Sequence, residues 1–143
     1  MEQKYFARRF SDLIVYQRAC EISSNLFKLS RRFPREEMFA LTDQIRRSSR
    51  SIGAQISEAW AKRKYKKAFL SKLTDADGEQ LETQHWVGVA ADCGYLTSEE
   101  TNSLITSLEE VGGMLRGVME KVELFLIRDN HRIQEKADAS EED

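Results

Sequence analysis

The chain has 143 residues, of which 41% are hydrophobic and 32% are charged, and its net charge at pH 7 is −2. This length allows one domain with a sizeable core. One proline and seven glycines are too few for the frequent turns of an all-β protein, so helices are expected. The sequence lacks both the run of about 18 apolar residues that a membrane-spanning helix needs and the apolar stretch of a secretory signal. We therefore expect a cytoplasmic protein, with Cys20 and Cys93 as reduced, buried thiols.

The two halves of the chain carry opposite charge. Residues 1–67 hold 16 basic and 7 acidic residues, a net charge of +9, whereas residues 68–143 hold 6 basic and 17 acidic ones, a net charge of −11. Such a split indicates binding to partners rather than to a small substrate. Basic side chains are densest over residues 42–67, where they alternate with small residues suited to close helix packing.

The first predicted helix covers residues 11–33. Ser11 can act as its N-cap, because a serine hydroxyl accepts a hydrogen bond from a first-turn amide. Pro34 ends the helix. The helix has one apolar stripe with steps of four and three: Val15, Ala19, Ile22, Leu26, Leu29 and Phe33. The apolar residues of the following link are expected to cover the end of the bundle: Met38, Phe39 and Leu41.

The second and third predicted helices cover residues 42–61 and 66–92, with a basic joint between them. The inner face of the second is formed by Ile45, Ser49, Ile52, Ile56 and Ala59. The inner face of the third is marked by Phe69, Leu73, Ala76, Val87 and Ala90. Gln80 and Thr83 interrupt this third stripe, and a buried polar group costs about 1–3 kcal/mol unless it is hydrogen-bonded. We therefore expect a hydrogen-bonded polar layer halfway along the bundle.

The fourth predicted helix covers residues 98–127 and has the most regular pattern of the chain. Gly94 fits the left-handed position that ends the third helix, and Thr97 with Glu100 has the spacing of a capping box. Repeats of this kind favour helix crossing angles of about 20°. The apolar stripe is Leu104, Leu108, Val111, Leu115, Val118, Val122 and Phe125.

Two features indicate close contacts beyond these stripes. Glycine inside a helix costs about 1 kcal/mol relative to alanine, so we expect a neighbouring helix close to Gly112, Gly113 and Gly117. Four large apolar residues lie off the main stripes of their helices, and a narrow seam is too small to bury them all: Leu70, Trp86, Met114 and Leu124. We expect an oligomer to bury several of them.

Together these elements predict an all-α protein, a left-handed antiparallel up-and-down four-helix bundle. Residues 1–128 form its single domain. The remaining residues, 129–143, are acidic and poor in apolar side chains, and we expect them to be a flexible tail.

Segments spread along the chain match one family in order: Asp12–Ala19, Phe33–Pro34, Leu41–Ser48, Ile52, Ile56, Glu58, Gly78, Leu81–Gln84 and Gly94–Leu96. On these residues the chain resembles the 23S rRNA intervening-sequence proteins, bacterial four-helix bundles named for reading frames inside insertions in ribosomal RNA genes. The resemblance implies a left-handed bundle, a ring-shaped homopentamer and no established catalytic activity. The chain departs from the family at Ala59 and Ala61, where glycine is usual.

The basic segment is the main candidate for binding. Lys and Arg side chains neutralise phosphates and release counterions, and Tyr65 could stack on an unpaired base. The structural alternative is a solvated face whose charges meet acidic residues of the third and fourth helices, within or between subunits. The candidate nucleic-acid-binding residues are Arg46, Arg47, Arg50, Lys62, Arg63, Lys64, Lys66 and Lys67.

A buried polar network is a second interpretation of the same arginines. In an antiparallel helix pair, Arg46 or Arg47 could reach inward to Asp77 or Glu82. Such a network fixes register more than it adds stability. The candidate members are Arg46, Arg47, Asp77, Gln80, Glu82 and Gln84.

The sequence offers no convincing set of metal-binding residues. Glu82 and His85 have the ExxH spacing of di-iron bundles, but such sites need a second ExxH and two further glutamates. The other histidine, His131, has Arg128 three residues before it. Phosphate-binding loops and nucleophile elbows are also missing from the sequence. We therefore expect no metal, no cofactor and no small-molecule substrate.

The predicted function is a non-enzymatic, oligomeric binding or scaffold module that contacts RNA or a nucleic-acid-handling partner. One alternative is a purely protein–protein scaffold or an accessory subunit, for example to a reverse transcriptase, as the resemblance admits. A more distant alternative is an enzyme that uses Glu58, Glu82 and Arg46 in a cleft.

Overall fold

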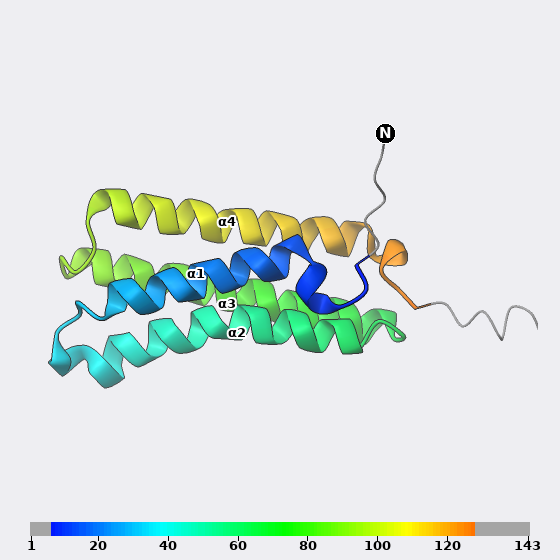
Figure 1. Cartoon of the computed structure of the whole chain (residues 1–143), viewed down its shortest axis with the longest axis horizontal. Coiled ribbons are helices and arrows are strands. Elements are labelled where there is room, and N and C mark those ends of the chain that lie inside the picture. The colour runs from blue at the N-terminus through cyan, green and yellow to red at the C-terminus, as the bar shows by residue number, and fades with distance from the viewer. Residues whose placement is uncertain (1–6, 128–143) are drawn as a thin grey trace, which may run out of the picture.

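The structure is a computed structural model that describes residues 7–127. Within this range it is all-helical, with four long helices and no β-strand. Successive helices run in opposite directions and lie side by side (Figure 1). The prediction of an all-α protein with four helices is confirmed, while the left-handed sense of the bundle stays a prediction. The helices are α1 (Ile14–Ser30), α2 (Asp43–Ala61), α3 (Lys66–Asp92) and α4 (Ser98–Glu120).

The core is one apolar cluster to which all four helices contribute. Leu26 of α1, Ile52 of α2, Val87 of α3 and Leu115 of α4 are all fully buried. Burying a side chain of this size stabilises the fold by about 1.5–3 kcal/mol. The helical periodicity of the sequence therefore places the core correctly on each helix.

α1 begins later than predicted, and Ser11 is not its N-cap. Residues Phe10–Asp12 form a short 3-10 turn, and the Asp12 carboxylate accepts hydrogen bonds from two preceding backbone N–H groups at 3.0 and 3.2 Å. The aspartate therefore closes a turn of its own before the helix starts. Leu13 then takes the N-cap position in an extended conformation, without a side-chain cap.

The link between α1 and α2 is helical and exposes an aromatic side chain. A 3-10 turn, Arg35–Glu37, leads into one π-helical turn, Met38–Thr42, which continues directly into α2. Leu41 is 1% exposed, as expected for a residue that covers the bundle end, but Phe39 is 82% exposed. The prediction for Phe39 was wrong because the wide turn directs Leu41 and Thr42 inward and leaves the preceding ring on the outer side.

The turn between α3 and α4 has the two features that its sequence predicts. Gly94 has a φ of +79°, in the left-handed region that favours glycine. The backbone N–H of Glu100 donates to the Thr97 hydroxyl at 3.1 Å, and the backbone N–H of Thr97 donates to the Glu100 carboxylate at 2.9 Å. Both the C-terminal glycine of α3 and the capping box of α4 are confirmed.

α4 ends at Glu120, earlier than the predicted residue 127. A 3-10 turn, Val122–Leu124, follows it, and the backbone N–H of Ile127 then donates to the carbonyl of Arg63 at 3.1 Å. The chain therefore crosses to the joint between α2 and α3 instead of extending the helix.

Several expectations about the surface have mixed outcomes. Leu70, Trp86 and Met114 pack partly against the core, whereas Leu124 is 77% exposed. The two cysteines are free thiols, as expected, but both are exposed rather than buried. No helix among residues 7–127 combines the length and apolar character needed to cross a membrane. The predicted acidic tail, residues 129–143, lies outside the described residues.

Candidate nucleic-acid interface

Three arginines surround one phenylalanine ring where α1 ends and α2 begins. The guanidinium carbons of Arg31, Arg46 and Arg50 lie 4.7, 4.7 and 5.3 Å from the centroid of the Phe27 ring. Phe27 of α1 and Arg31, the helical C-cap residue that follows it, are four residues apart, as are Arg46 and Arg50 on α2, so each pair shares a helix face. The electron-rich face of the ring attracts the cations. We use the name arginine cluster for these three residues, Arg31, Arg46 and Arg50, together with Arg47, which follows Arg46 on α2.

A hydrogen bond across the helix pair fixes the direction of Arg46. Its Nε donates to the hydroxyl of Ser30 at 2.8 Å, and that hydroxyl donates to the carbonyl of Phe27 at 3.0 Å. Ser30 is only 2% exposed. The guanidinium is therefore anchored on its inner side, while its terminal nitrogens are left for an external acceptor.

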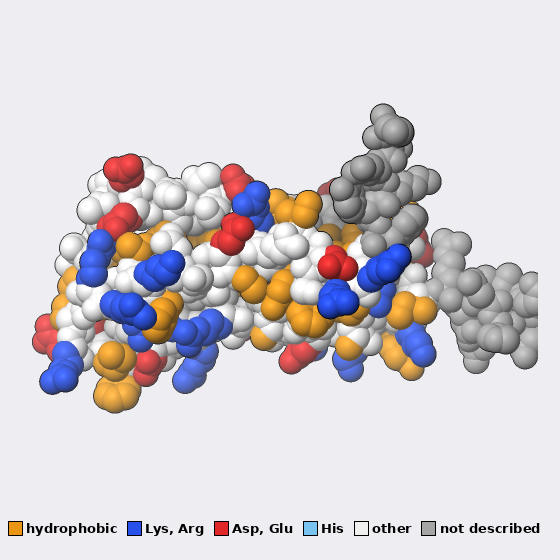
Figure 2. Space-filling model, viewed as in Figure 1, with side chains coloured by type: hydrophobic (Ala, Val, Ile, Leu, Met, Phe, Trp, Pro, Cys, Tyr) orange, Lys and Arg blue, Asp and Glu red, His pale blue; other side chains and the backbone are white. Residues whose placement is uncertain are grey.

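The three arginines of the cluster that belong to α2 line an open groove of about 460 Å³ on the outer face of that helix. Its lining residues are Asp43, Arg46, Arg47, Arg50, Ser51 and Ala54. None of the arginines in the cluster forms an ion pair with a carboxylate among residues 7–127. Figure 2 shows Lys and Arg side chains gathered over this end of α1 and α2. With three arginines and one aspartate in its lining, the groove therefore carries a net positive charge.

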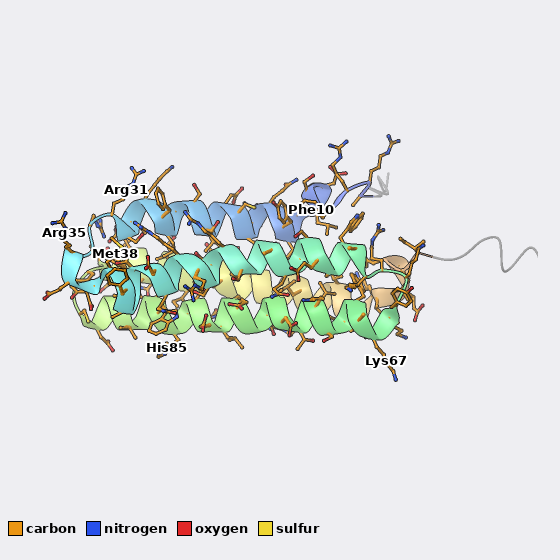
Figure 3. The ribbon with its side chains drawn as sticks, turned by 90° about the horizontal axis from the view of Figure 1, so that it is seen from below. Phe10, Arg31, Arg35, Met38, Lys67 and His85 are labelled. Atoms are coloured by element: carbon orange, nitrogen blue, oxygen red, sulfur yellow. The ribbon has the colours of Figure 1, made fainter. Side chains whose placement is uncertain are left out.

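The lysines at the joint between α2 and α3 form a separate group. Sixteen residues separate Arg46 from Lys62, which corresponds to about 24 Å along a helix. Figure 3 shows Arg31 and Arg35 at one end of the bundle and Lys67 at the opposite end. The structure therefore divides the single basic surface predicted over residues 46–67 into two.

The second basic group is partly neutralised or buried. Lys66 forms an ion pair with Glu123 at 2.7 Å. Arg63 stacks on Trp60 at 3.4 Å and donates its Nε to the carbonyl of that residue at 2.8 Å, and burial lowers the pKa of the Arg63 guanidinium. Three exposed cations remain in this group, namely Lys62, Lys64 and Lys67. The arginine cluster is therefore the stronger of the two candidates for binding an anion.

Most of the predicted polar network is present, but the arginine that pairs with its aspartate is not one of the two that the sequence suggested. Gln80 donates its side-chain amide to Asp77 at 2.9 Å, and Gln84 donates to Gln80 at 2.8 Å. The cation beside Asp77 is Arg116 of α4, at 3.6 Å. The prediction paired Asp77 with Arg46 or Arg47 of α2. That pairing is corrected, because Arg46 turns instead toward the α1 side of its helix.

Glu82, the other acidic residue assigned to this network, is exposed. It lies near Glu79, whose pKa is raised by burial and then by the charge of Glu82. The hydroxyl of Thr83 completes the polar layer, since it donates to the backbone carbonyl of Glu79 at 2.8 Å and lies within hydrogen-bond distance of the Ser48 hydroxyl, at 2.9 Å. The layer is therefore hydrogen-bonded as expected, without Glu82.

The residues of the alternative enzyme site do not converge. Glu58 pairs with Lys72 at 2.7 Å, and this hydrogen bond lowers the pKa of the Glu58 carboxyl. Arg46 lies twelve residues before Glu58 on the same helix, about 18 Å away along its axis. Among residues 7–127, no three His, Cys, Asp or Glu side chains are grouped so that they could hold a metal ion.

The prediction from sequence missed Phe27, Ser30 and Arg31. The four-residue spacing of Phe27 and Arg31 was a usable signal for a ring–cation pair at the end of α1. The sequence had no signal for the contact of this pair with Arg46 and Arg50, because that contact depends on how α1 and α2 are offset along their axes.

Comparison with known proteins gives three findings. The sequence profile of the family described as 23S rRNA-intervening sequence protein matches residues 11–117. Among solved structures, the chain is similar to a protein with unknown function from the S23 ribosomal protein family of Bacteroides thetaiotaomicron. The two have 28% sequence identity and a TM-score of 0.67, and the similarity covers 74% of this chain and 98% of that chain. A search among curated proteins found no match.

Proposed function

The chain belongs to the family of 23S rRNA-intervening sequence proteins, and we propose that it is a non-enzymatic module that binds nucleic-acid phosphates through its arginine cluster. The observation that carries this proposal is the grouping of Arg46, Arg47 and Arg50 along one groove, where they outnumber the single carboxylate, Asp43, and form no ion pair within residues 7–127. Guanidinium groups match phosphate geometry through paired N–H donors. The family description itself links these proteins to intervening sequences of 23S rRNA.

The proposal includes a homo-oligomer in the cytoplasm, a pentamer by resemblance. Ile14 and Leu124 are 63% and 77% exposed, and large apolar side chains on a surface are suited to subunit contacts. An oligomer would repeat the arginine cluster by symmetry. Several weak phosphate contacts would then add up to useful affinity.

The arginine cluster would also suit an acidic protein partner, which corresponds to the scaffold or accessory-subunit alternative. Carboxylates accept hydrogen bonds from arginine in the same paired geometry as phosphates. The two partners differ in charge density, because nucleic acid releases condensed counterions when it binds and a folded acidic protein releases far fewer. The salt dependence of binding therefore distinguishes them.

The test measures fluorescence anisotropy of a labelled single-stranded RNA at about 50 and 200 mM salt. We expect binding at low salt that weakens steeply at high salt. The double variant Arg46→Gln, Arg50→Gln should weaken binding and reduce the salt slope by about one for each phosphate that the variant no longer neutralises. The matched variant Lys62→Gln, Lys67→Gln removes the same charge at the joint between α2 and α3 and should have a smaller effect. Lack of RNA binding at low salt would overturn the proposal, as would equal weakening in the two variants.

A further inference from the structure

We infer that the arginine cluster takes a single strand of nucleic acid, with Phe39 stacking on an unpaired base beside the phosphates that the arginines hold. This inference rests on the proposed function and adds the class of nucleic acid to it. It starts from Phe39, the most exposed of the large hydrophobic side chains that the structure describes, at 82%. Its neighbour Met38 is 38% exposed.

The local backbone holds the ring away from the core. Leu41 and Thr42, on the same π-helical turn, are each 1% exposed and occupy the inner side. The turn is bonded into α2, since the backbone N–H of Asp43 donates to the carbonyl of Met38. Segments of π-helix are rare and are found frequently at functional sites. The exposed ring is therefore a fixed feature of a helical turn and not part of an irregular loop.

Phe39 lies on the turn that precedes α2, on the same helical face as the residues that line the groove. The turn Met38–Thr42 runs directly into α2, and Phe39, Asp43, Arg46 and Arg50 follow one another at steps of four, three and four residues, which is one face of a helical rod. Figure 3 shows Met38 beside Arg35 and Arg31 at this end of the bundle. Figure 2 shows hydrophobic side chains protruding among the Lys and Arg side chains there.

The spacing suits a short stretch of nucleic acid. Seven residues separate Phe39 from Arg46, which corresponds to about 10 Å along a helix. This distance is about three times the 3.4 Å spacing of nucleotides along one strand of a duplex. A phenyl ring can stack on any base, but only if the face of that base is free. In a duplex the neighbouring base pairs cover these faces, so the ring favours a single strand.

An acidic peptide is the rival occupant. It would satisfy the arginines through its carboxylates, but it presents no flat ring system that would make an aromatic side chain better than an aliphatic one of similar size. The substitution Phe39→Leu separates the two cases, because it keeps an apolar side chain and removes the aromatic face. Phe39→Tyr keeps the aromatic face and is the matched control. Because Phe39 is exposed, both variants should fold, and thermal melting checks this.

The experiment compares three labelled probes of equal length: a single-stranded RNA of about 20 nucleotides, the same RNA as a duplex, and poly-glutamate. We expect the single strand to bind more tightly than the duplex. Phe39→Leu should weaken binding of the single strand about five- to hundredfold, leave duplex binding nearly unchanged and be rescued by Phe39→Tyr.

The outcomes separate this inference from the proposed function. Equal affinity for single strand and duplex, or a Phe39→Leu variant that affects both probes alike, would overturn the inference. The proposed function would survive that result as long as RNA binding stays salt-dependent and requires Arg46 and Arg50. Poly-glutamate binding that equals RNA binding would overturn both and favour a protein partner. Failure of every RNA probe to bind at low salt would also overturn both.

Discussion

Gly112 of α4 lies directly against the side chain of Gln80 of α3. A Cβ atom added at Gly112 would be 2.8 Å from Nε2 of Gln80 and 3.2 Å from Oδ1 of Asp77. Gln80 is 2% exposed and is hydrogen-bonded at both ends of its amide, to Asp77 and to Gln84. The absence of a side chain at position 112 therefore makes room for the polar layer. The predicted close approach of a neighbouring helix is therefore found at Gly112, but not at Gly113 or Gly117, where an added Cβ atom would meet no group of the described chain within 4 Å.

The first prediction compares Gly112→Ala with Gly113→Ala. A Cβ at Gly113 would meet no other group of the described chain within 4 Å, so alanine there should raise the free energy of unfolding by about 1 kcal/mol through helix propensity. Gly112→Ala gains the same propensity but displaces the Gln80 amide, so it should give no increase or a decrease. Urea denaturation of the two variants measures the difference. Equal stabilisation by both alanines would show that the polar layer tolerates the extra methyl group.

The second prediction concerns two buried threonines. The hydroxyl of Thr83 donates to the carbonyl of Glu79 and forms a second hydrogen bond with the hydroxyl of Ser48, whereas the buried hydroxyl of Thr42 has no hydrogen-bond partner within the described residues. Thr83→Val should lower the free energy of unfolding by about 1 kcal/mol or more, because it leaves the buried Ser48 hydroxyl without its Thr83 partner. Thr42→Val replaces an unsatisfied hydroxyl with a methyl group and should be neutral or stabilising. Thermal melting of both variants tests this, and a larger destabilisation at Thr42 would contradict it.

The third prediction concerns the pH dependence of the turn before α4. The carboxylate of Glu100 accepts a hydrogen bond from Arg32 at 2.7 Å and another from the backbone N–H of Thr97 at 2.9 Å. Arg32 first, and then the Thr97 amide, lower the pKa of Glu100 from 4.5 to about 2. Since the folded pKa is the lower one, the ionised carboxylate stabilises the fold above pH 4.5, and this stabilisation disappears as the pH falls toward 2.

Glu100→Gln should therefore lower the melting temperature at neutral pH, and its difference from the original chain should shrink as the pH falls through that window. Glu99→Gln is the matched control, because Glu99 is exposed and its carboxylate forms no hydrogen bond or ion pair with the described residues. It should change the melting temperature little at any pH. A Glu100→Gln effect that does not vary with pH would contradict the assignment.

The fourth prediction addresses self-association. If subunits meet through the exposed apolar surface, Leu124→Glu should shift the chain toward smaller species, because burying an unpaired carboxylate at a subunit interface is costly. Ser103→Glu adds the same charge at an exposed polar position of α4 and is the control. Sedimentation velocity at micromolar concentration measures both. If the original chain sediments as a monomer, the proposed oligomer is excluded.

Much of the fold could be predicted because the signals are local. The bounds of α3, the glycine after it and the capping box of Thr97 depend on residues within one or two turns of each other. Two errors, the start of α1 and the expected burial of Phe39, also arise from local turns that replace the regular α-helix. Asp12 closes a turn ahead of α1, and the π-helical turn that exposes Phe39 has no reliable sequence pattern.

The candidate site could be predicted only in part. The sequence by itself identified Arg46, Arg47 and Arg50 as candidate binding residues beside the buried seam of the second helix, since a period of 3.6 residues fixes the direction of a side chain around its own helix. The tertiary structure alone decided that Arg46 meets Ser30 and Phe27, that Arg116 serves Asp77, and that the lysines of the joint lie apart from the arginine cluster. The physical reason is that periodicity says nothing of the offset and rotation of one helix relative to another. Those two quantities depend on how all four apolar stripes pack together at once.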